Sequence, residues 1–418
     1  MKKLQIKKDP VFFQNKDFQT IMIKMIFPFK RREEDLALLS ILPNLLNNVD
    51  AKYPTEREFA MEHQKLLILS SSCNCSTMGE EAYFTFHLIV PDPKAIHQDL
   101  LEEQFSFFSE MIYHPKIKKN AFCTEEVMRE IQNQKMDIEH LYQDTYQYSF
   151  LKGKELVDPT GRFASSIYNH PELIDSVTEK SLYEFYLRTI YHNQPMIYIF
   201  GNGNTKELKA YCRRYLYRED FSEKQVPVSL KNYLPVRESV LRVTEESSFQ
   251  NSVYLTFYKV KDMKEEDEVL LNTIQGLLSS QSSRILYKKL RDENDLVYAT
   301  YAASYNTYGV LSIASFIHEK NLEFVQEKTQ EALDDLKNPE IISPLLEGLK
   351  ERMRVSIIRQ ADDKISLFQD CITKDLGFDL TSEEQYQKLL LITPSDIASF
   401  MERLVFDTEY FLKEGDHV

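Results

Sequence analysis

A long internal repeat constrains the fold of this chain more than any other feature of its sequence. The segment EEDLALLSILPNLL, which begins at Glu33, matches EEDEVLLNTIQGLL, which begins at Glu265, at seven of fourteen positions and at an offset of 232 residues. Upstream, segments 17–29 and 248–260 correspond at an offset of 231 residues. Solenoid repeats are only about 20–50 residues long. We therefore predict a duplication that gives two related halves.

Each half contains the same order of predicted elements. A β run is followed by an apolar helix with acidic residues in its first turn, two further β runs, long amphipathic helical stretches and a final strand. The β runs lie at 20–27, 66–73, 82–90 and 195–201 in the first half and at 252–258, 296–305, 310–316 and 409–415 in the second, and the helical stretches lie at 97–150 and 319–373. This order predicts an α+β fold, in which each half is a mainly antiparallel sheet covered on one face by helices.

A linker is predicted between the halves. Segment 219–239 contains two prolines, many charged residues and little periodicity, which is typical of a connection between domains. The predicted halves are therefore residues 1–218 and residues 240–418.

Composition excludes several classes of function. The net charge of −14 lacks the basic footprint of a nucleic-acid-binding protein and disfavours docking on anionic lipid. No apolar run approaches the roughly 18 residues of a membrane span, and MKKLQIKKDP lacks the apolar core of a secretory signal. The five cysteines are few and irregularly spaced, and we interpret them as reduced thiols. We expect a cytoplasmic protein that binds neither nucleic acid nor membrane.

Motifs for catalysis within this chain were not found. The sequence has no GxSxG, no P-loop and no GxGxxG. No two of its nine histidines are closer than ten residues, so no helix can present the histidine pair at positions i and i+4 that commonly binds zinc. We interpret the histidines as surface or core residues and expect no active site that this chain completes by itself.

The two halves, together with the string SSRILYKKLRDENDLVYATYAASYNTYGVLSI, resemble the small bacterial branch of the pitrilysin/insulinase family of inverted zinc peptidases. The resemblance covers nearly the whole chain and implies a clamshell fold. In that family, the histidines of an H-x-x-E-H helix and a later glutamate bind Zn²⁺, and the glutamate of the motif activates water. The matching positions here are Ser40, Pro43 and Asn44, with the third ligand position near Asp137. The resemblance thus implies a degenerate metal site in the first half and no zinc bound by this chain.

A second family feature is retained in the other half. Arg291 and Tyr298 stand seven residues apart, and an arginine and a tyrosine at this spacing contact the substrate in the family. A guanidinium and a phenol can donate hydrogen bonds to a peptide backbone and to a carbonyl oxygen that gains charge. Without the resemblance, an ion pair of Arg291 with its acidic neighbours and a packing role for Tyr298 are the simpler interpretation.

The loss of the metal motif together with the retained pair resembles the zinc-less subunits of two-chain peptidases. Examples are the pair associated with 5-aminopentanol modification of elongation factor P and the partners of leader-peptide peptidases. We predict a non-catalytic subunit of a heterodimeric zinc endopeptidase, which binds extended peptide and supplies Arg291 and Tyr298 to a zinc-bearing paralogue that contains H-x-x-E-H. Leader-peptide or precursor processing is one use of such an enzyme. A peptide-binding or scaffold protein without proteolysis, and an independent hydrolase with other ligands, are the alternatives.

Overall fold

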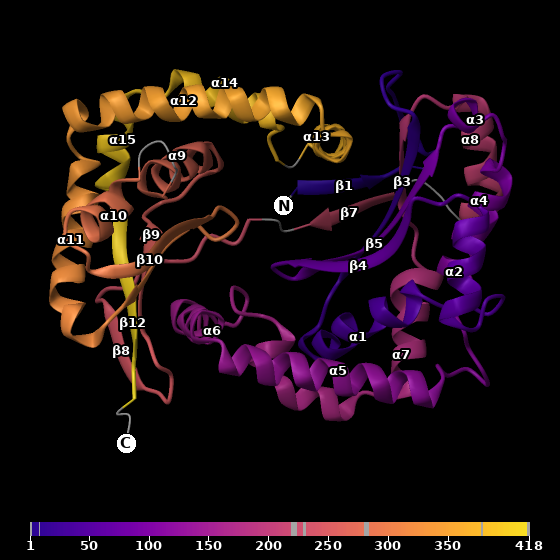
Figure 1. Ribbon diagram of the computed structural model, residues 1–418, viewed down its shortest axis with the longest axis horizontal. Helices are drawn as coiled ribbons and strands as arrows, with labels where there is room; N and C mark the ends of the chain where they lie inside the picture. Colours follow the sequence, from indigo (N-terminus) through magenta and orange to yellow (C-terminus); the bar gives the residue numbers. More distant parts are fainter. Residues whose placement is uncertain are drawn as a thin grey trace. The chain divides into compact units, whose positions relative to one another are not determined.

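Two compact units make up the computed structural model, which describes residues 2–7, 9–218, 224–228, 231–279, 284–377 and 379–415. Unit 1 comprises Met1–Ile138, Ser165–Leu230 and Cys371–Phe378, and unit 2 comprises Glu139–Ala164, Lys231–Asp370 and Asp379–Val418. Each unit contains a five-stranded sheet with helices packed on it (Figure 1). The predicted α+β fold with two related halves is confirmed.

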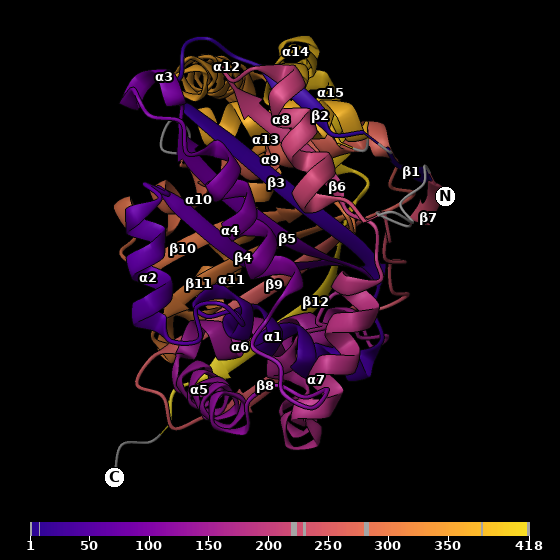
Figure 2. The same cartoon turned by 90° about the vertical axis from the view of Figure 1, so that its right-hand side faces the viewer.

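The sheet of unit 1 has the strand order β2-β6-β3-β5-β4. Only β2 and β6 run parallel, and the other neighbours are antiparallel. The strands are β2 (Val11–Gln14), β3 (Thr20–Lys30), β4 (Ser70–Met78), β5 (Glu81–Pro91) and β6 (Met196–Gly201). In Figure 2, helices α4 and α8 lie in front of this sheet. Strand β4 lies at one edge of this sheet, which is the position at which a strand of another chain can pair with a sheet.

The longer helices of unit 1 bury apolar residues, whereas the short α3 (Pro93–Ile96) buries none. They are α1 (Leu36–Asn47), α2 (Glu56–Lys65), α4 (Leu101–Tyr113), α7 (Glu179–Tyr186) and α8 (Thr205–Tyr211), and α5 (Thr124–Gln143) continues into unit 2. In α4, apolar residues at helical spacing, including Phe105, Phe108 and Ile112, are completely buried.

The sheet of unit 2 repeats this plan with the order β10-β11-β9-β12-β8. Its strands are β8 (Leu241–Glu246), β9 (Ser252–Val260), β10 (Val297–Tyr305), β11 (Val310–Ile317) and β12 (Leu404–Lys413). All nine residues of β9 are buried, because this central strand is covered on both faces. The edge strand β10 is the counterpart of β4.

One face of the second sheet packs against a layer of helices. These are α9 (Glu268–Ser279), α10 (Ile285–Tyr287), α11 (Leu322–Asp335), α12 (Pro339–Ala361), α14 (Ser382–Leu391) and α15 (Pro394–Met401), while α13 (Lys364–Leu376) begins in unit 2 and ends in unit 1. Among the residues that the structure describes, no helix is both long enough and apolar enough to cross a membrane.

The opposite face of the second sheet is covered by a helix from the first half of the sequence. Helix α6 (Thr145–Val157) packs on β9 and β12. Its Gly153 lies so close to the sheet that a Cβ atom there would be 2.6 Å from Leu255 and 2.7 Å from Phe257. The compact units therefore do not coincide with the sequence halves 1–218 and 240–418.

Part of the predicted linker 219–239 forms regular structure. Strand β7 (Lys224–Val228) pairs antiparallel with β1 (Lys2–Ile6), and together they form a separate two-stranded sheet. Residues 219–223 and 229–230 of the predicted linker lie outside the described residues.

Candidate functional site

Helix α1 carries the three positions at which the family resemblance places the first zinc ligands and the general base. The helix continues to Asn47 although Pro43 interrupts it, and Pro43 is buried among the apolar residues of the helix. Proline removes the N–H that would bond to the carbonyl of Leu39, which costs roughly 3 kcal/mol in an isolated helix. The buried apolar face of α1 stabilises the helix against this loss.

The residues at these positions do not fit a zinc ion. The Ser40 hydroxyl donates a hydrogen bond to the Ala37 carbonyl of its own helix, with 2.9 Å between the oxygens. Pro43 offers no ligand atom, and Asn44 is exposed. Zinc sites in proteins use thiolate, imidazole and carboxylate ligands. Across the described ranges, no group of three or more histidines, cysteines, aspartates or glutamates is arranged to hold a metal.

Helix α5 is the element near which the third ligand position was predicted. Asp137 is exposed on this helix. The inward face of α5 instead carries Glu130 and Gln134, which are each 8% exposed. Glu130 accepts hydrogen bonds from Arg129 (3.1 Å) and Asn133 (3.3 Å). The spacing of three and four residues between Val127, Glu130, Gln134 and Ile138 could have identified this face from the sequence.

Arg291 and Tyr298 are brought together in unit 2. Arg291 lies on the last turn of a short helical segment, Lys288–Asp292, and its Nη1 donates a hydrogen bond of 2.8 Å to the Val297 carbonyl. The same nitrogen lies 3.0 Å from the Asp295 carboxylate. Since Tyr298 directly follows Val297 at the start of β10, the backbone of β10 links the guanidinium to the phenol.

The local backbone directs Tyr298 outward. The pairing of β10 with β11 is irregular between Val297 and Ala299, so Tyr298 occupies a bulge. A bulge re-aims one side chain of an edge strand. The side chain of Tyr298 is 49% exposed and can therefore contact another molecule.

His318 is a partner of Tyr298 that sequence reasoning missed. The Tyr298 hydroxyl forms a hydrogen bond with Nε2 of His318, and the two rings meet edge to face with centroids 5.0 Å apart. On its other side, His318 Nδ1 lies 3.8 Å from a Glu414 carboxylate oxygen. The pairing of the two strands could have indicated this contact. Val297 faces Ile317 across the β10–β11 pair, so the residues that follow them, Tyr298 and His318, lie close together.

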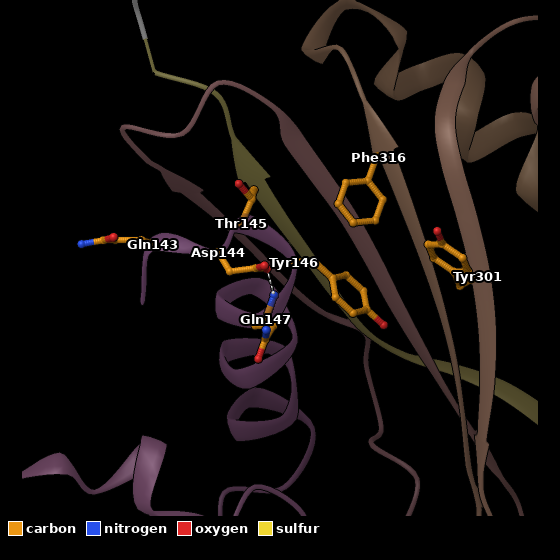
Figure 3. Close-up of a pocket in the computed structure, with 7 residues that line it drawn as sticks. All are labelled: Gln143, Asp144, Thr145, Tyr146, Gln147, Tyr301 and Phe316. Carbon is orange, nitrogen blue, oxygen red and sulfur yellow. Dashed lines mark hydrogen bonds between the residues drawn. The ribbon is translucent and has the colours of Figure 1, made fainter. Parts of the chain in front are cut away.

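An aromatic recess lies on the side of this sheet that α6 covers (Figure 3). It has a volume of about 620 Å³, and its lining residues are Gln143, Asp144, Thr145, Tyr146, Gln147, Tyr301 and Phe316. The ring of Tyr146 lies 5.5 Å from that of Phe316 and 6.3 Å from that of Tyr301, between centroids. Burial, and then the neighbouring Tyr301 phenol, raise the pKa of Tyr146, so its hydroxyl stays neutral. A recess of this kind suits an apolar or aromatic group.

Comparison with known proteins relates the chain to one peptidase family. The chain matches the family described as "Peptidase M16 inactive domain" over residues 176–353. It is also 21% identical over 398 residues to the "Probable inactive metalloprotease YmfF" of Bacillus subtilis (strain 168), and the match covers 94% of this chain and 92% of that protein. The chain thus resembles the M16, or pitrilysin, peptidase family.

Solved structures share the fold of this chain. A conserved protein from Enterococcus faecalis V583 superposes with a TM-score of 0.86 at 18% identity, covering 100% of this chain and 99% of that one. A peptidase M16 inactive domain from Pseudomonas fluorescens superposes with a TM-score of 0.71 at 14% identity, with coverage of 99% and 98%. At these identities, the likeness concerns the fold alone.

Proposed function

We propose that this M16 chain is the non-catalytic subunit of a heterodimeric zinc endopeptidase. In this proposal a paralogous subunit brings the H-x-x-E-H helix and its zinc, and this chain binds extended peptide and supplies Arg291 and Tyr298. The observation that carries the proposal is the contact of Arg291 with the Val297 carbonyl beside the half-exposed Tyr298. The proposal is also supported by helix α1, where Ser40, Pro43 and Asn44 offer no zinc ligands of the usual kind.

The arrangement has donors suited to a peptide. Among the described residues, both contacts given for the Arg291 guanidinium use Nη1, so Nε and Nη2 remain as donors for a substrate carbonyl. The Tyr298 hydroxyl can donate to an oxygen that gains negative charge when water attacks a peptide bond. The aromatic recess beside Tyr301 would hold a side chain of the same peptide. We place this complex in the cytoplasm, where leader-peptide or precursor processing would use it.

Reconstitution tests the proposal. The purified chain is mixed with a paralogous subunit from the same genome that contains H-x-x-E-H, and cleavage of a quenched fluorescent peptide library is measured. We expect cleavage by the mixture, none by this chain alone, and loss of cleavage with a chelator. The Arg291→Ala, Tyr298→Phe double variant should lower kcat/KM by about 10²-fold or more, because it removes two donors to the reacting carbonyl.

A matched control uses Lys288→Ala, since Lys288 is exposed on the same helical turn as Arg291. This variant should leave cleavage unchanged. Unaltered cleavage by the double variant, or chelator-sensitive cleavage by this chain alone, would contradict the proposal.

A second candidate is a peptide-binding or scaffold protein without proteolysis. The aromatic recess formed by Tyr146, Tyr301 and Phe316 favours it, because peptide binding there needs no catalytic partner. This alternative predicts peptide binding that depends on Tyr301, no cleavage in any mixture, and no special effect of Arg291→Ala.

A further inference from the structure

The side chain of Asn47 is bonded to the backbone of the edge strand β4. Asn47 is the last residue of α1, and Cys73 lies in the middle of β4. The Cys73 N–H donates to Oδ1 of Asn47 over 2.5 Å, and Nδ2 of Asn47 donates to the Cys73 carbonyl over 3.0 Å. One carboxamide thus occupies both backbone hydrogen-bonding groups of one strand residue.

The direction of these bonds shows which side of the strand is covered. Cys73 faces Phe86 in the antiparallel register of β4 and β5. In such pairs, the N–H and C=O of one residue point to the same side, alternately toward and away from the partner strand. Because the groups of Cys73 bond to Asn47, they point away from β5, toward the outer edge of the sheet. A residue of an added antiparallel strand would offer Cys73 the same donor and acceptor that Asn47 now provides.

The second half has a cap at the corresponding place. Nε2 of Gln275 and Oγ of Ser279 donate to the Ala302 carbonyl over 3.0 Å and 3.4 Å. Both residues lie on α9, Ala302 lies on the edge strand β10, and Ser279 is the counterpart of Asn47 at the repeat offset of 232 residues. Each half thus uses the end of its repeated helix to cover the middle of its edge strand. In the first half, the cap takes both the donor and the acceptor.

We propose that Asn47 closes the β4 edge to strand addition, so that an extended peptide can pair with β4 only after the Asn47 side chain releases Cys73. Exposed edges otherwise recruit other strands. The side chain of Asn47 is half-buried and Cys73 is completely buried, so water competes weakly for these two bonds. The inference rests on the proposed function only for the class of ligand, an extended peptide.

A fluorescent peptide tests the closure. The probe is an acetylated peptide of alternating threonine and valine with a C-terminal tryptophan amide, and its anisotropy is measured. The chain has no tryptophan, so the signal comes from the peptide alone. Asn47→Ala should bind the probe about tenfold more tightly than the unmodified protein, because the Cys73 N–H and C=O become available. The control Asn48→Ala changes the exposed neighbour and should bind within about twofold of the unmodified protein.

Two further measurements make the outcome decisive. A probe methylated on every second backbone nitrogen cannot donate to a strand edge and should lose the gain seen with Asn47→Ala. Hydrogen exchange of the Cys73 amide should accelerate in Asn47→Ala. If Asn47→Ala folds poorly, Asn47→Leu replaces it, since leucine is close in size to asparagine and has neither the donor nor the acceptor.

A folded variant whose Cys73 amide exchanges at the original rate would overturn the proposal, as would probe affinity within about twofold of the original. These outcomes do not depend on the zinc-bearing partner. Failure of reconstituted cleavage would therefore count against the proposed function, whereas failure here would count against the closure of β4.

Discussion

Asp35 binds the guanidinium of Arg188, and the second half repeats this ion pair with Asp267 and Arg403. The Asp35 and Arg188 atoms are 2.5 Å apart, and Arg403 contacts Asp267 through two nitrogens at 2.9 Å and 2.7 Å. Each aspartate also accepts a backbone N–H three residues earlier, at 2.8 Å, where its helix begins. The third acid of the repeated EED segment therefore has a structural role that both halves share.

Asp267→Asn tests this role in unit 2. The substitution leaves the Arg403 guanidinium without its charged partner, so we expect a loss of about 1–3 kcal/mol in the free energy of unfolding. Urea denaturation followed by circular dichroism measures it. The neighbouring Glu266→Gln is a control, because Glu266 is exposed and should change stability by less than about 0.5 kcal/mol. Equal stability of the two variants would show that the Asp267–Arg403 ion pair does not contribute to the free energy of unfolding.

Acidification should weaken the same contact. Burial alone would raise the pKa of Asp267, but hydrogen bonds from Arg403 and the Lys264 backbone outweigh it and lower that pKa below its ordinary value of 3.8. The unfolded chain then binds a proton at pH values at which folded Asp267 remains ionised. This stabilisation is present above pH 3.8 and is lost as the pH falls through the folded pKa. Thermal unfolding between pH 5 and pH 3 should therefore show a steeper loss for the unmodified protein than for Asp267→Asn.

A buried ion pair secures α6 to the second sheet. Nζ of Lys259 lies 3.1 Å from the Asp407 carboxylate and donates to the carbonyls of Val157 and Pro235, each over 3.1 Å. Asp407→Asn leaves a buried ammonium without a counter-charge, and we expect a loss of about 3–5 kcal/mol. Chemical denaturation measures it, with Asp334→Asn in an exposed ion pair as the control expected to lose less than about 1 kcal/mol. Similar losses of stability in both variants would show that Asp407 does not offset the buried charge of Lys259.

The thiols of β4 should be unreactive in the folded protein. Cys73 is completely buried, and burial raises its pKa; burial also raises the pKa of Cys75 to about 12. The thiolate is the reactive form, so both residues should resist iodoacetamide at pH 8. Mass spectrometry of the labelled protein tests this, with urea-unfolded protein, in which all five cysteines are expected to react, as the reference. Rapid labelling of Cys73 in the native protein would show that this thiol is not buried.

The duplicated architecture was predictable because its signals are local. The repeated EED segments and the apolar spacing that follows them predict helices at the same place in each half, and α1 and α9 confirm this. The sheet on which α6 packs was not predictable, because an amphipathic pattern shows that one face of a helix is buried but not which sheet covers that face. The close approach of Gly153 to Leu255 depends on contacts about one hundred residues apart in sequence.

The candidate site was predictable to a smaller extent. The spacing of Arg291 and Tyr298 indicated the pair, but their connection through the Val297 carbonyl depends on how the helix end meets the bulge in β10. The position near Asp137 relied on counting along a helix whose inward face lies at other residues, including Glu130. His318 approaches Tyr298 only through strand pairing, which a search for short motifs does not detect.

The placement of α6 also bears on how the duplicated gene could have changed. A gene truncated to its second repeat would encode a sheet whose Leu255 and Phe257 had lost the helix that covers them, leaving an apolar surface prone to aggregation. The second repeat therefore depends on a helix that the first repeat supplies and could not be transferred to another gene without it.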